Sequence, residues 1–297
     1  MAPAKLILVT GATGRQGGAV VQALLKQGQR VRALTRNPSS HAGRRMAAQG
    51  VEVVAGDFTD HSSLVRAARC ADAIFAMTTP YEQGVEEEIS HGMALVNAAR
   101  EAEVGHFVYS SVASANRATG IPHFDSKFEI EKHLMASGLP YTIVAPVFFM
   151  ENILQPHSLK ELAMGRLERP MPGDRALQQI AIADIGAFTA AVIARREDVF
   201  GYRFDIAGDE LNGEEEAAIL SKATGRDIHY KGVLPDALRP QNDEMAAMYE
   251  WFFHTGYAAD IDRLRRDFPE VEWHDLESWA LAQDWVVLED VRSETFA

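Results

Sequence analysis

Three glycines that follow a short apolar run near the N-terminus constrain the fold more than any other feature of this chain. Residues 6–9 (LILV) lead into Gly11, Gly14 and Gly17, and apolar residues then recur at helical spacing over residues 20–25. A strand that turns into a helix through such glycines presents free backbone N–H groups and the positive end of the helix dipole, which together stabilise a pyrophosphate. The stretch therefore predicts a dinucleotide site or, alternatively, only a tight strand-to-helix turn.

If the stretch holds a cofactor, the loop itself supplies most of the contacts. Glycines let the backbone approach the pyrophosphate closely, and the side chains of Thr13 and Gln16 add hydrogen-bond donors. Arg15 adds a positive charge at the same turn. The cofactor-binding residues predicted in this loop are Gly11, Thr13, Gly14, Arg15, Gln16 and Gly17.

Short apolar runs alternate with amphipathic stretches through the first half of the sequence. This alternation is typical of repeated βα units, and such units form a parallel sheet with helices on both faces. We therefore expect an α/β fold with a doubly wound, Rossmann-type sheet. The strands expected in it are residues 5–10, 30–35, 51–54, 72–77, 106–111 and 140–145.

Beyond about residue 150 the alternation weakens and prolines interrupt it. We expect a nucleotide-binding domain over residues 1–150 and a smaller mixed lobe over residues 151–297 that is partly interleaved with the sheet. In this second part a helix capped by Asp184 and a helix over residues 213–223 are expected. The strands expected at residues 202–207 and 227–233 would extend the sheet.

Composition excludes several classes of function. The chain has 297 residues, of which 47% are hydrophobic, so it can bury a sizeable core. Its formal net charge of −13 repels nucleic acids and anionic lipids. A single cysteine, Cys70, forms no internal disulfide, and there is neither a signal-peptide pattern nor an apolar run of about 20 residues. We expect a cytoplasmic protein that binds neither membranes nor nucleic acids.

The end of the second expected strand indicates which cofactor binds. An acidic residue at that place favours the ribose of NAD, whereas an arginine favours the 2′-phosphate of NADP. The sequence there is TRNP, with Arg36 and no acidic residue, and Arg15 can add a second charge. We predict NADP(H) with Arg36 as a ligand; the alternative is that Arg36 is a solvated strand-end charge.

The third expected strand ends in a short polar and aromatic segment. Asp57 and Phe58 are placed to hold an adenine by its edge and its face. Alternatively, Asp57 caps a turn or a helix. The sequence alone leaves both roles of Asp57 open.

Five stretches of the sequence resemble the NmrA-like branch of the atypical short-chain dehydrogenase/reductases, over nearly the whole chain. They are residues 10–18 (TGATGRQGG), 35–38 (TRNP), 56–57 (GD), 123–127 (HFDSK) and 148–152 (FFMEN). HFDSK is the most specific, and it is similar to members described as NADP(H) redox sensors and to bacterial relatives. The resemblance implies an NADP(H)-binding Rossmann fold. The residues that it places around the nicotinamide ribose are Met77, Thr78, Thr79, Phe149, Asn152 and Lys127.

The catalytic pair of typical short-chain dehydrogenase/reductases is incomplete here. Those enzymes use a tyrosine four residues before a lysine, because the ammonium lowers the phenol pKa so that the phenol relays a proton. The tyrosine position is His123, whereas Lys127 is present, and Ser110 and Ser111 lie near the usual serine. Lys127 is predicted as catalytic, as the resemblance to plant phenylpropanoid reductases implies. His123 is either a proton relay or simply the start of a helix.

Other groupings indicate no metal site and no nucleophile. Glu129 and His133 lie one helical turn apart but lack further ligands, and we expect a solvated helix face. The aromatic run at residues 249–253 either lines a substrate pocket or forms part of a lobe core.

Two functions of different class follow. The first is an NADPH-dependent reductase of a small electron-poor acceptor such as a quinone or enone, with Lys127 orienting the ribose and polarising the acceptor. The second is an NADP(H) redox sensor without turnover that regulates a protein partner. The missing tyrosine favours the sensor, and the retained lysine favours the reductase; a homodimer is left open.

Overall fold

A computed structural model describes residues 4–289, and its contacts divide the chain into two units. The first unit comprises the chain up to Pro146 together with Ile182–Asp205 and Asp267–Glu272. The second takes the intervening segments, Val147–Ala181 and Ile206–Arg266, and the chain from Trp273 onward.

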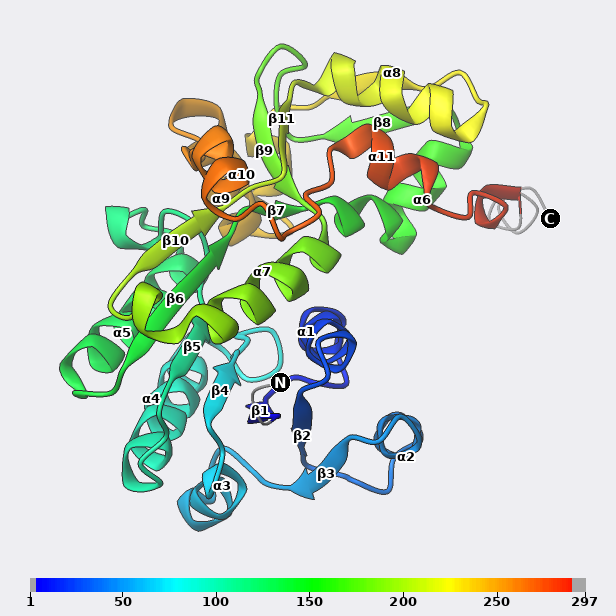
Figure 1. Cartoon of the computed structure of the whole chain (residues 1–297). Helices are drawn as coiled ribbons and strands as arrows, with labels where there is room; N and C mark the ends of the chain where they lie inside the picture. Colours follow the sequence, from blue (N-terminus) through cyan, green and yellow to red (C-terminus); the bar gives the residue numbers. More distant parts are fainter. Residues whose placement is uncertain (1–3, 290–297) are drawn as a thin grey trace. The chain divides into compact units, whose positions relative to one another are not determined.

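The first unit is built on a seven-stranded sheet with the strand order β10-β6-β5-β4-β1-β2-β3 (Figure 1). The pairs β1–β2, β2–β3, β1–β4, β4–β5 and β5–β6 are parallel. This order confirms the doubly wound Rossmann-type sheet, and the direction of winding reverses between β1 and β4. The strands are β1 (Leu6–Val9), β2 (Arg30–Thr35), β3 (Glu52–Ala55), β4 (Ala73–Ala76), β5 (Phe107–Ser110), β6 (Tyr141–Pro146) and β10 (Arg203–Ile206).

Helices cover both faces of this sheet (Figure 1). On one face α1 (Arg15–Lys26) packs against α7 (Ile182–Arg195), and α2 (His41–Ala48) follows β2. Gly186 allows the close α1–α7 approach, because a Cβ there would lie 2.6 Å from the carbonyl oxygen of Ala19. On the other face α3 (His61–Ala68), α4 (Val85–Glu101) and α5 (Pro122–Ala136) lie side by side.

The main core of the first unit lies between the sheet and the α3–α5 layer. Leu8 and Ile74 from the strands pack with Leu95 and Ile130 from the helices, and all are nearly inaccessible to solvent. These strands are apolar on both faces because helices cover both. The sequence pattern of continuous apolar runs follows directly from that arrangement.

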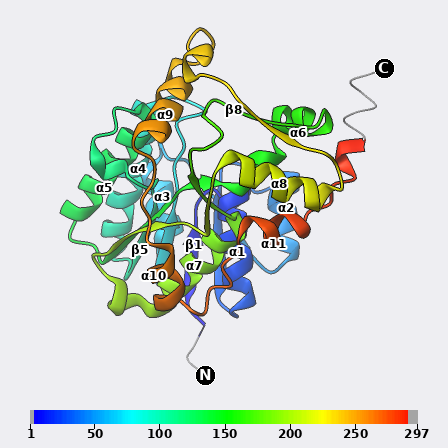
Figure 2. The same cartoon turned by 90° about the horizontal axis from the view of Figure 1, so that it is seen from above.

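As far as residue 289, the second unit contains two small sheets and five α-helices. The strand order is β11-β9-β7 in one sheet, and β12 pairs with β8 in the other. Helix α8 begins with a capping box formed by Asn212 and Glu215, and it lies beside α11 (Figure 2). The strands are β7 (Phe148–Phe149), β8 (Arg166–Arg169), β9 (Leu177–Ile180), β11 (Asp209–Leu211) and β12 (His229–Gly232), and the helices are α6 (Pro156–Ala163), α8 (Gly213–Thr224), α9 (Asp243–His254), α10 (Ile261–Asp267) and α11 (Leu276–Leu281).

Two expectations for the C-terminal half were wrong. The strand expected at residues 227–233 exists as β12, but it pairs with β8 and does not extend the large sheet. Asp184 is not the cap of α7, because the helix begins at Ile182 and Asp184 lies buried in its first turn. The apolar residues before Asp184 continue the helix, so the polar residue did not mark its start.

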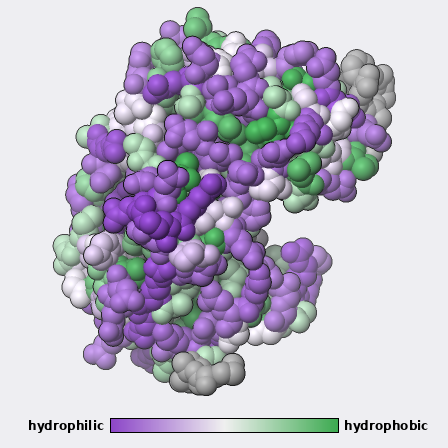
Figure 3. All heavy atoms as spheres, turned by 45° about the horizontal axis from the view of Figure 1, so that its top comes forward, coloured by the Kyte–Doolittle hydropathy of each residue, from purple (hydrophilic) through white to green (hydrophobic). Residues whose placement is uncertain are grey.

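Short 3-10 helices connect several elements. They are η1 (Ala115–Arg117), η2 (Met150–Leu154), η3 (Arg196–Val199) and η4 (Pro235–Leu238). One face of the molecule is mostly hydrophilic with scattered hydrophobic residues (Figure 3), as the excess of acidic side chains suggests. Within residues 4–289, no helix is long and apolar enough to cross a bilayer.

Candidate functional site

The glycine loop joins β1 to α1, and two of its glycines lie too close to neighbouring atoms to carry a side chain. Gly11 has φ of +60°, and a Cβ there would lie 2.6 Å from Met77 Sδ. A Cβ on Gly17 would lie 2.3 Å from the Gly11 carbonyl oxygen. Gly14 stands immediately before α1 and has no side chain to cap the helix, so its first-turn N–H groups face outward for an anion. The loop therefore fits a pyrophosphate.

The loop lies at the point where the sheet reverses its winding. Thr10, at the end of β1, accepts a hydrogen bond from Met77 N at 2.8 Å and donates one to Met77 O at 3.0 Å. Thr78 and Thr79 follow directly, so the segment after β4 is tied to the segment after β1. Ligands of open α/β sheets bind outside the strand carboxyl ends at this reversal. The predicted contacts Thr78 and Thr79 lie at that position, Thr78 buried and Thr79 exposed.

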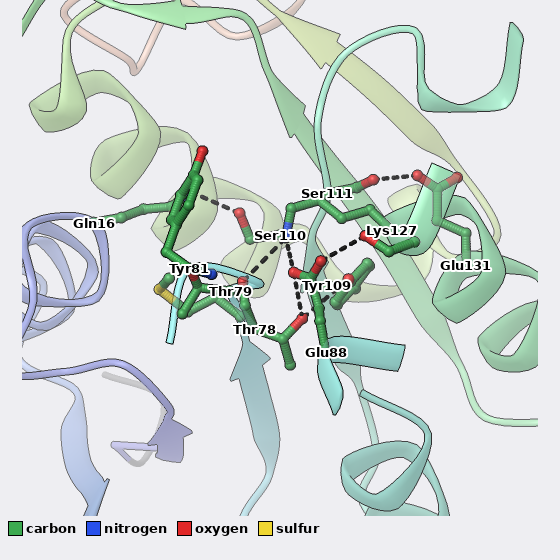
Figure 4. Close-up of polar contacts among 12 residues, drawn as sticks. Gln16, Thr78, Thr79, Tyr81, Glu88, Tyr109, Ser110, Ser111, Lys127 and Glu131 are labelled. Carbon is green, nitrogen blue, oxygen red and sulfur yellow. Dashed lines mark hydrogen bonds and ion pairs between the residues drawn. The ribbon is translucent and has the colours of Figure 1, made fainter. Parts of the chain in front are cut away.

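Lys127 is held at the same edge by two acceptors (Figure 4). Its ammonium donates to the Thr78 carbonyl oxygen at 3.0 Å and to Glu88 Oε1 at 2.7 Å. The Lys127 side chain is 13% exposed, whereas that of Glu88 is 0% exposed. Lys127 comes from α5, Glu88 from α4 and Thr78 from the segment after β4. Three separate elements thus fix the ammonium at the carboxyl edge of the sheet.

Both carboxylate oxygens of Glu88 accept hydrogen bonds. Besides Lys127, Thr78 Oγ1 donates to Oε1 at 3.1 Å, and Ser126 Oγ donates to Oε2 at 2.6 Å. The Tyr109 hydroxyl lies 3.4 Å from Thr78 Oγ1. Burial raises the pKa of Tyr109 well above its usual value, and the charge of Glu88 acts in the same direction, so this phenol stays neutral. The charges of Lys127 and Glu88 compensate each other, and the hydroxyl groups of Thr78 and Ser126 donate to the carboxylate.

The end of β5 contributes two serines with different partners. Gln16 Nε2 donates to Ser110 Oγ at 2.6 Å, and both side chains are buried. Ser111 donates to Glu131, which also forms an ion pair with Arg203 at 3.0 Å. Gln16, predicted to bind the cofactor, therefore uses its side chain to tie α1 to β5.

His123 lies in the first turn of α5, directly after Pro122. Its ring centroid is 4.9 Å from that of Phe124 and 6.4 Å from that of Tyr81, an exposed residue of the segment between β4 and α4. His123 and Lys127 are four residues apart and thus share one helix face. His123 does lie at the start of a helix, and its role as a proton relay stays a prediction.

The two predicted arginine ligands are both exposed. Arg36 follows β2, and its guanidinium lies 3.0 Å from the Glu82 carboxylate, with 67% of the Arg36 side chain exposed. Arg15 is the first residue of α1. An exposed ion pair of this kind is weak, so it does not prevent Arg36 from binding a phosphate.

Asp57 has a structural partner. Its Oδ1 accepts hydrogen bonds from Thr59 N at 2.9 Å and from Thr59 Oγ1 at 2.7 Å. The backbone hydrogen bond from Thr59, followed by its hydroxyl, lowers the pKa of Asp57. Asp57 therefore caps a turn, which is one of the two roles expected from the sequence. The Phe58 ring packs against His91 with centroids 5.2 Å apart, so contact with an adenine stays a prediction for both residues.

Phe149 and Asn152 belong to the second unit, at the end of β7 and in η2. Their contribution to a cofactor site stays a prediction. In the same unit Phe252 is buried and contacts Phe148, Tyr249 and Tyr257 with centroid separations of 6.3, 5.6 and 5.1 Å. The aromatic run at residues 249–253 therefore contributes to the core of this unit.

Glu129 and His133 each have another partner. Glu129 forms an exposed ion pair with Lys132 at 2.5 Å, and His133 Nε2 lies 3.0 Å from Asn97 Oδ1. Within the described part of the chain, no group of three or more histidine, cysteine, aspartate or glutamate side chains is arranged to hold a metal ion.

Sequence reasoning missed Glu88. The signal was present, because Glu88 shares a stripe with Gly92, Leu95, Val96 and Ala99, at the spacing of one helix face. A carboxylate on an otherwise apolar face needs a partner of opposite charge. That requirement could have directed attention to Lys127.

The sheet order and the glycine loop define a dinucleotide-binding protein of Rossmann type. The family model described as the NmrA-like family matches residues 3–280. The chain is also 30% identical over 230 residues to the NAD(P)H azoreductase of Xenophilus azovorans, with 77% of each chain covered. This chain therefore belongs to the NmrA-like family.

Solved structures share the fold over nearly the whole chain. The NADPH-dependent quinone oxidoreductase QOR2 of Escherichia coli, complexed with NADPH, matches with a TM-score of 0.70 and 25% identity, covering 98% of this chain and 100% of that one. NmrA, a negative transcriptional regulator in complex with NADP, matches with a TM-score of 0.80 and 21% identity, covering 97% of each chain. The cofactors in these two structures are of the class that the glycine loop predicts.

Proposed function

We propose that this protein is an NADPH-dependent reductase that acts on a small electron-poor acceptor such as a quinone or an enone. The observation that carries the proposal is the placement of the Lys127 ammonium by Glu88 and the Thr78 carbonyl at the edge of the sheet where ligands bind. The names of two relatives, an NAD(P)H azoreductase and an NADPH-dependent quinone oxidoreductase, support the reaction class.

NADP(H) is the cofactor that the residues fit best. The glycine loop accepts the pyrophosphate, because side chains at Gly11 and Gly17 would close it. Arg36 is exposed directly after β2, where a 2′-phosphate is recognised, and no acidic residue ends that strand. A phosphate carries more charge than the single carboxylate of Glu82 and takes its place beside Arg36.

Lys127 has two tasks in this proposal. It hydrogen-bonds the ribose and polarises the acceptor oxygen, where negative charge develops as the acceptor is reduced. When bound, NADPH supplies the hydride, and the acceptor then needs one further proton. His123 or solvent supplies that proton, and an electron-poor acceptor demands little acid catalysis.

The test is NADPH consumption by the purified protein with a panel of quinones, enones and aldehydes. Turnover should appear with at least one electron-poor acceptor, and Lys127→Ala should lower kcat at least a hundredfold. Lys132→Ala, an exposed lysine on the same helix, should change nothing. Because Lys127→Ala leaves Glu88 without its cation, a Lys127→Arg variant and melting curves separate lost chemistry from lost folding. Equal rates for Lys127→Ala and the unmodified protein would refute the proposal.

A redox sensor is the second candidate, and one observation favours it. The residue four before Lys127 is His123, where typical short-chain dehydrogenase/reductases have the catalytic tyrosine. NmrA, of the same fold, is described as a transcriptional regulator. Tight NADPH binding without reduction of any acceptor on the panel would make the sensor the better proposal.

A further inference from the structure

Glu88 is a fully buried carboxylate that no sequence motif identifies, and it forms an ion pair with Lys127 of the candidate site. Lys127 Nζ lies 2.7 Å from Glu88 Oε1, which also accepts from Thr78, and Ser126 donates to Oε2. A carboxylate with 0% exposure persists only with such partners, because burial of an unpaired charge is costly.

Two further titratable groups near the pair do not disturb its charge. Glu131, on α5 like Lys127, is neutralised by Arg203 of β10 at 3.0 Å. Tyr109, on β5, is a neutral phenol. Lys127 and Glu88 are oppositely charged partners at 2.7 Å, and their charges compensate each other.

The two redox states of the cofactor differ in charge at the nicotinamide ring. The oxidised ring is a cation and the reduced ring is neutral. An isolated ammonium beside the ring would repel the oxidised form and leave the reduced form unaffected. A carboxylate within hydrogen-bond distance of that ammonium cancels the repulsion.

We infer that Glu88 is a positioning and charge-compensating residue that sets the relative affinity of this site for NADP⁺ and NADPH. The inference rests on the proposed function in one respect, namely that Lys127 contacts the nicotinamide end of the cofactor. With the neutral pair in place, the oxidised cofactor is not expelled by Lys127. A site that holds both forms suits a reductase that must bind NADPH, react and release NADP⁺, and it discriminates poorly as a sensor.

The experiment measures dissociation constants of NADP⁺ and NADPH separately, by calorimetry at pH 6, for the full chain and its variants. In Glu88→Gln the ratio of the NADP⁺ constant to the NADPH constant should rise about three- to tenfold, since Lys127 keeps its charge without compensation. Glu88→Asp retains the charge and should restore most of the ratio. Glu87→Gln removes an exposed carboxylate one residue away and should leave the ratio unchanged.

A purely structural role for Glu88 gives a different result. Both constants would then rise together in Glu88→Gln, with an unchanged ratio, and that outcome overturns the inference. If Glu88→Gln does not fold, Glu88→Met decides in its place, because it removes the same charge without leaving a buried amide to be hydrogen-bonded, and it should raise the ratio in the same way. An unchanged ratio in Glu88→Met would equally overturn the inference.

The binding readout is independent of turnover, so the two proposals fail separately. A shifted ratio without reduction of any acceptor supports the role of Glu88 and refutes the reductase. Turnover that needs Lys127, combined with an unchanged ratio in Glu88→Gln, refutes the role of Glu88 alone. Absence of binding of either cofactor refutes both.

Discussion

Gln16 Nε2 lies 2.6 Å from Ser110 Oγ, so a residue of the glycine loop is anchored to the end of β5 rather than left free for a ligand. Removing either partner should cost about 1 kcal/mol of unfolding free energy, the usual net value of one buried hydrogen bond. A double-mutant cycle with Gln16→Leu and Ser110→Ala should give a coupling energy of similar size.

The same pair of variants tests the cofactor role predicted for Gln16. If its side chain only anchors the loop, Gln16→Leu and Ser110→Ala should weaken NADPH binding to a similar extent. A loss of affinity in Gln16→Leu with none in Ser110→Ala would show instead that the amide binds the cofactor directly.

Gly17→Ala should disrupt the glycine loop, whereas Gly18→Ala should not. A Cβ at residue 17 would lie 2.3 Å from the Gly11 carbonyl oxygen, which is backbone and cannot move aside cheaply, while a Cβ at residue 18 would lie 3.5 Å from the Ala12 carbonyl oxygen. We expect Gly17→Ala to lose about 1–3 kcal/mol of stability, as overpacked sites do, and to lose NADPH binding at least tenfold. Fluorescence titration with NADPH and urea unfolding of both variants check this expectation.

Arg36→Ala should lower the affinity for NADPH about tenfold or more and leave that for NADH unchanged, because only NADPH carries the 2′-phosphate. Arg30 is the matched control, since it is exposed and begins the same strand, at the opposite end from the candidate site. Equal losses for the two cofactors in Arg36→Ala would contradict the assignment of NADP(H).

His106 should make folding stability depend on pH. Its ring is inaccessible to solvent, and Nε2 lies 2.9 Å from Thr142 Oγ1. Burial, with smaller contributions from the charges of Arg196 and Lys5, lowers the pKa of His106 to about 3. The unfolded chain, with a histidine of ordinary pKa near 6.5, takes up a proton that the folded chain does not.

The stabilising effect of the neutral ring is therefore fully present above about pH 6.5 and falls as the pH drops toward 3. Between pH 7 and pH 5 the protein should lose about 1–2 kcal/mol of unfolding free energy through this residue. His106→Asn should flatten that part of the profile, whereas His157→Asn, at an exposed position, should not. An unchanged slope in His106→Asn would show that other groups cause the acid sensitivity.

The parallel sheet could be predicted because its strands are covered on both faces. Continuous apolar runs such as residues 6–9 and 73–76 occur only where helices bury both sides of a strand. Strand β9 escaped prediction for the opposite reason, since Gln178 and Gln179 lie at its centre. Both glutamines are buried because Gln178 bonds the backbone of Ala259 and Gln179 bonds Glu216, and sequence alone does not show such partners.

The parts of the candidate site that lie within short sequence motifs could be predicted. The glycine loop and Lys127 each belong to such a motif, and the chemistry of each motif explains its residue types. Glu88 lies 39 residues from Lys127 along the chain, and only the packing of α4 against α5 brings the two together. For Asp57 the sequence left a ligand and a turn cap as alternatives, and only the structure shows its hydrogen bonds from Thr59, two residues on.

The interleaving of the two units has a consequence for how the chain is made. β10 and α7 complete the large sheet and cover α1, yet both come from residues after Ala181, beyond the first segment of the second unit. On the ribosome, residues 1–146 emerge with one edge of β6 unpaired and with the apolar face of α1 uncovered. Domains otherwise tend to fold in order as synthesis proceeds. Because the first unit also contains Asp267–Glu272, it is complete only after residue 272 has left the exit tunnel, and until residue 206 has emerged β6 and α1 expose surfaces that later residues cover.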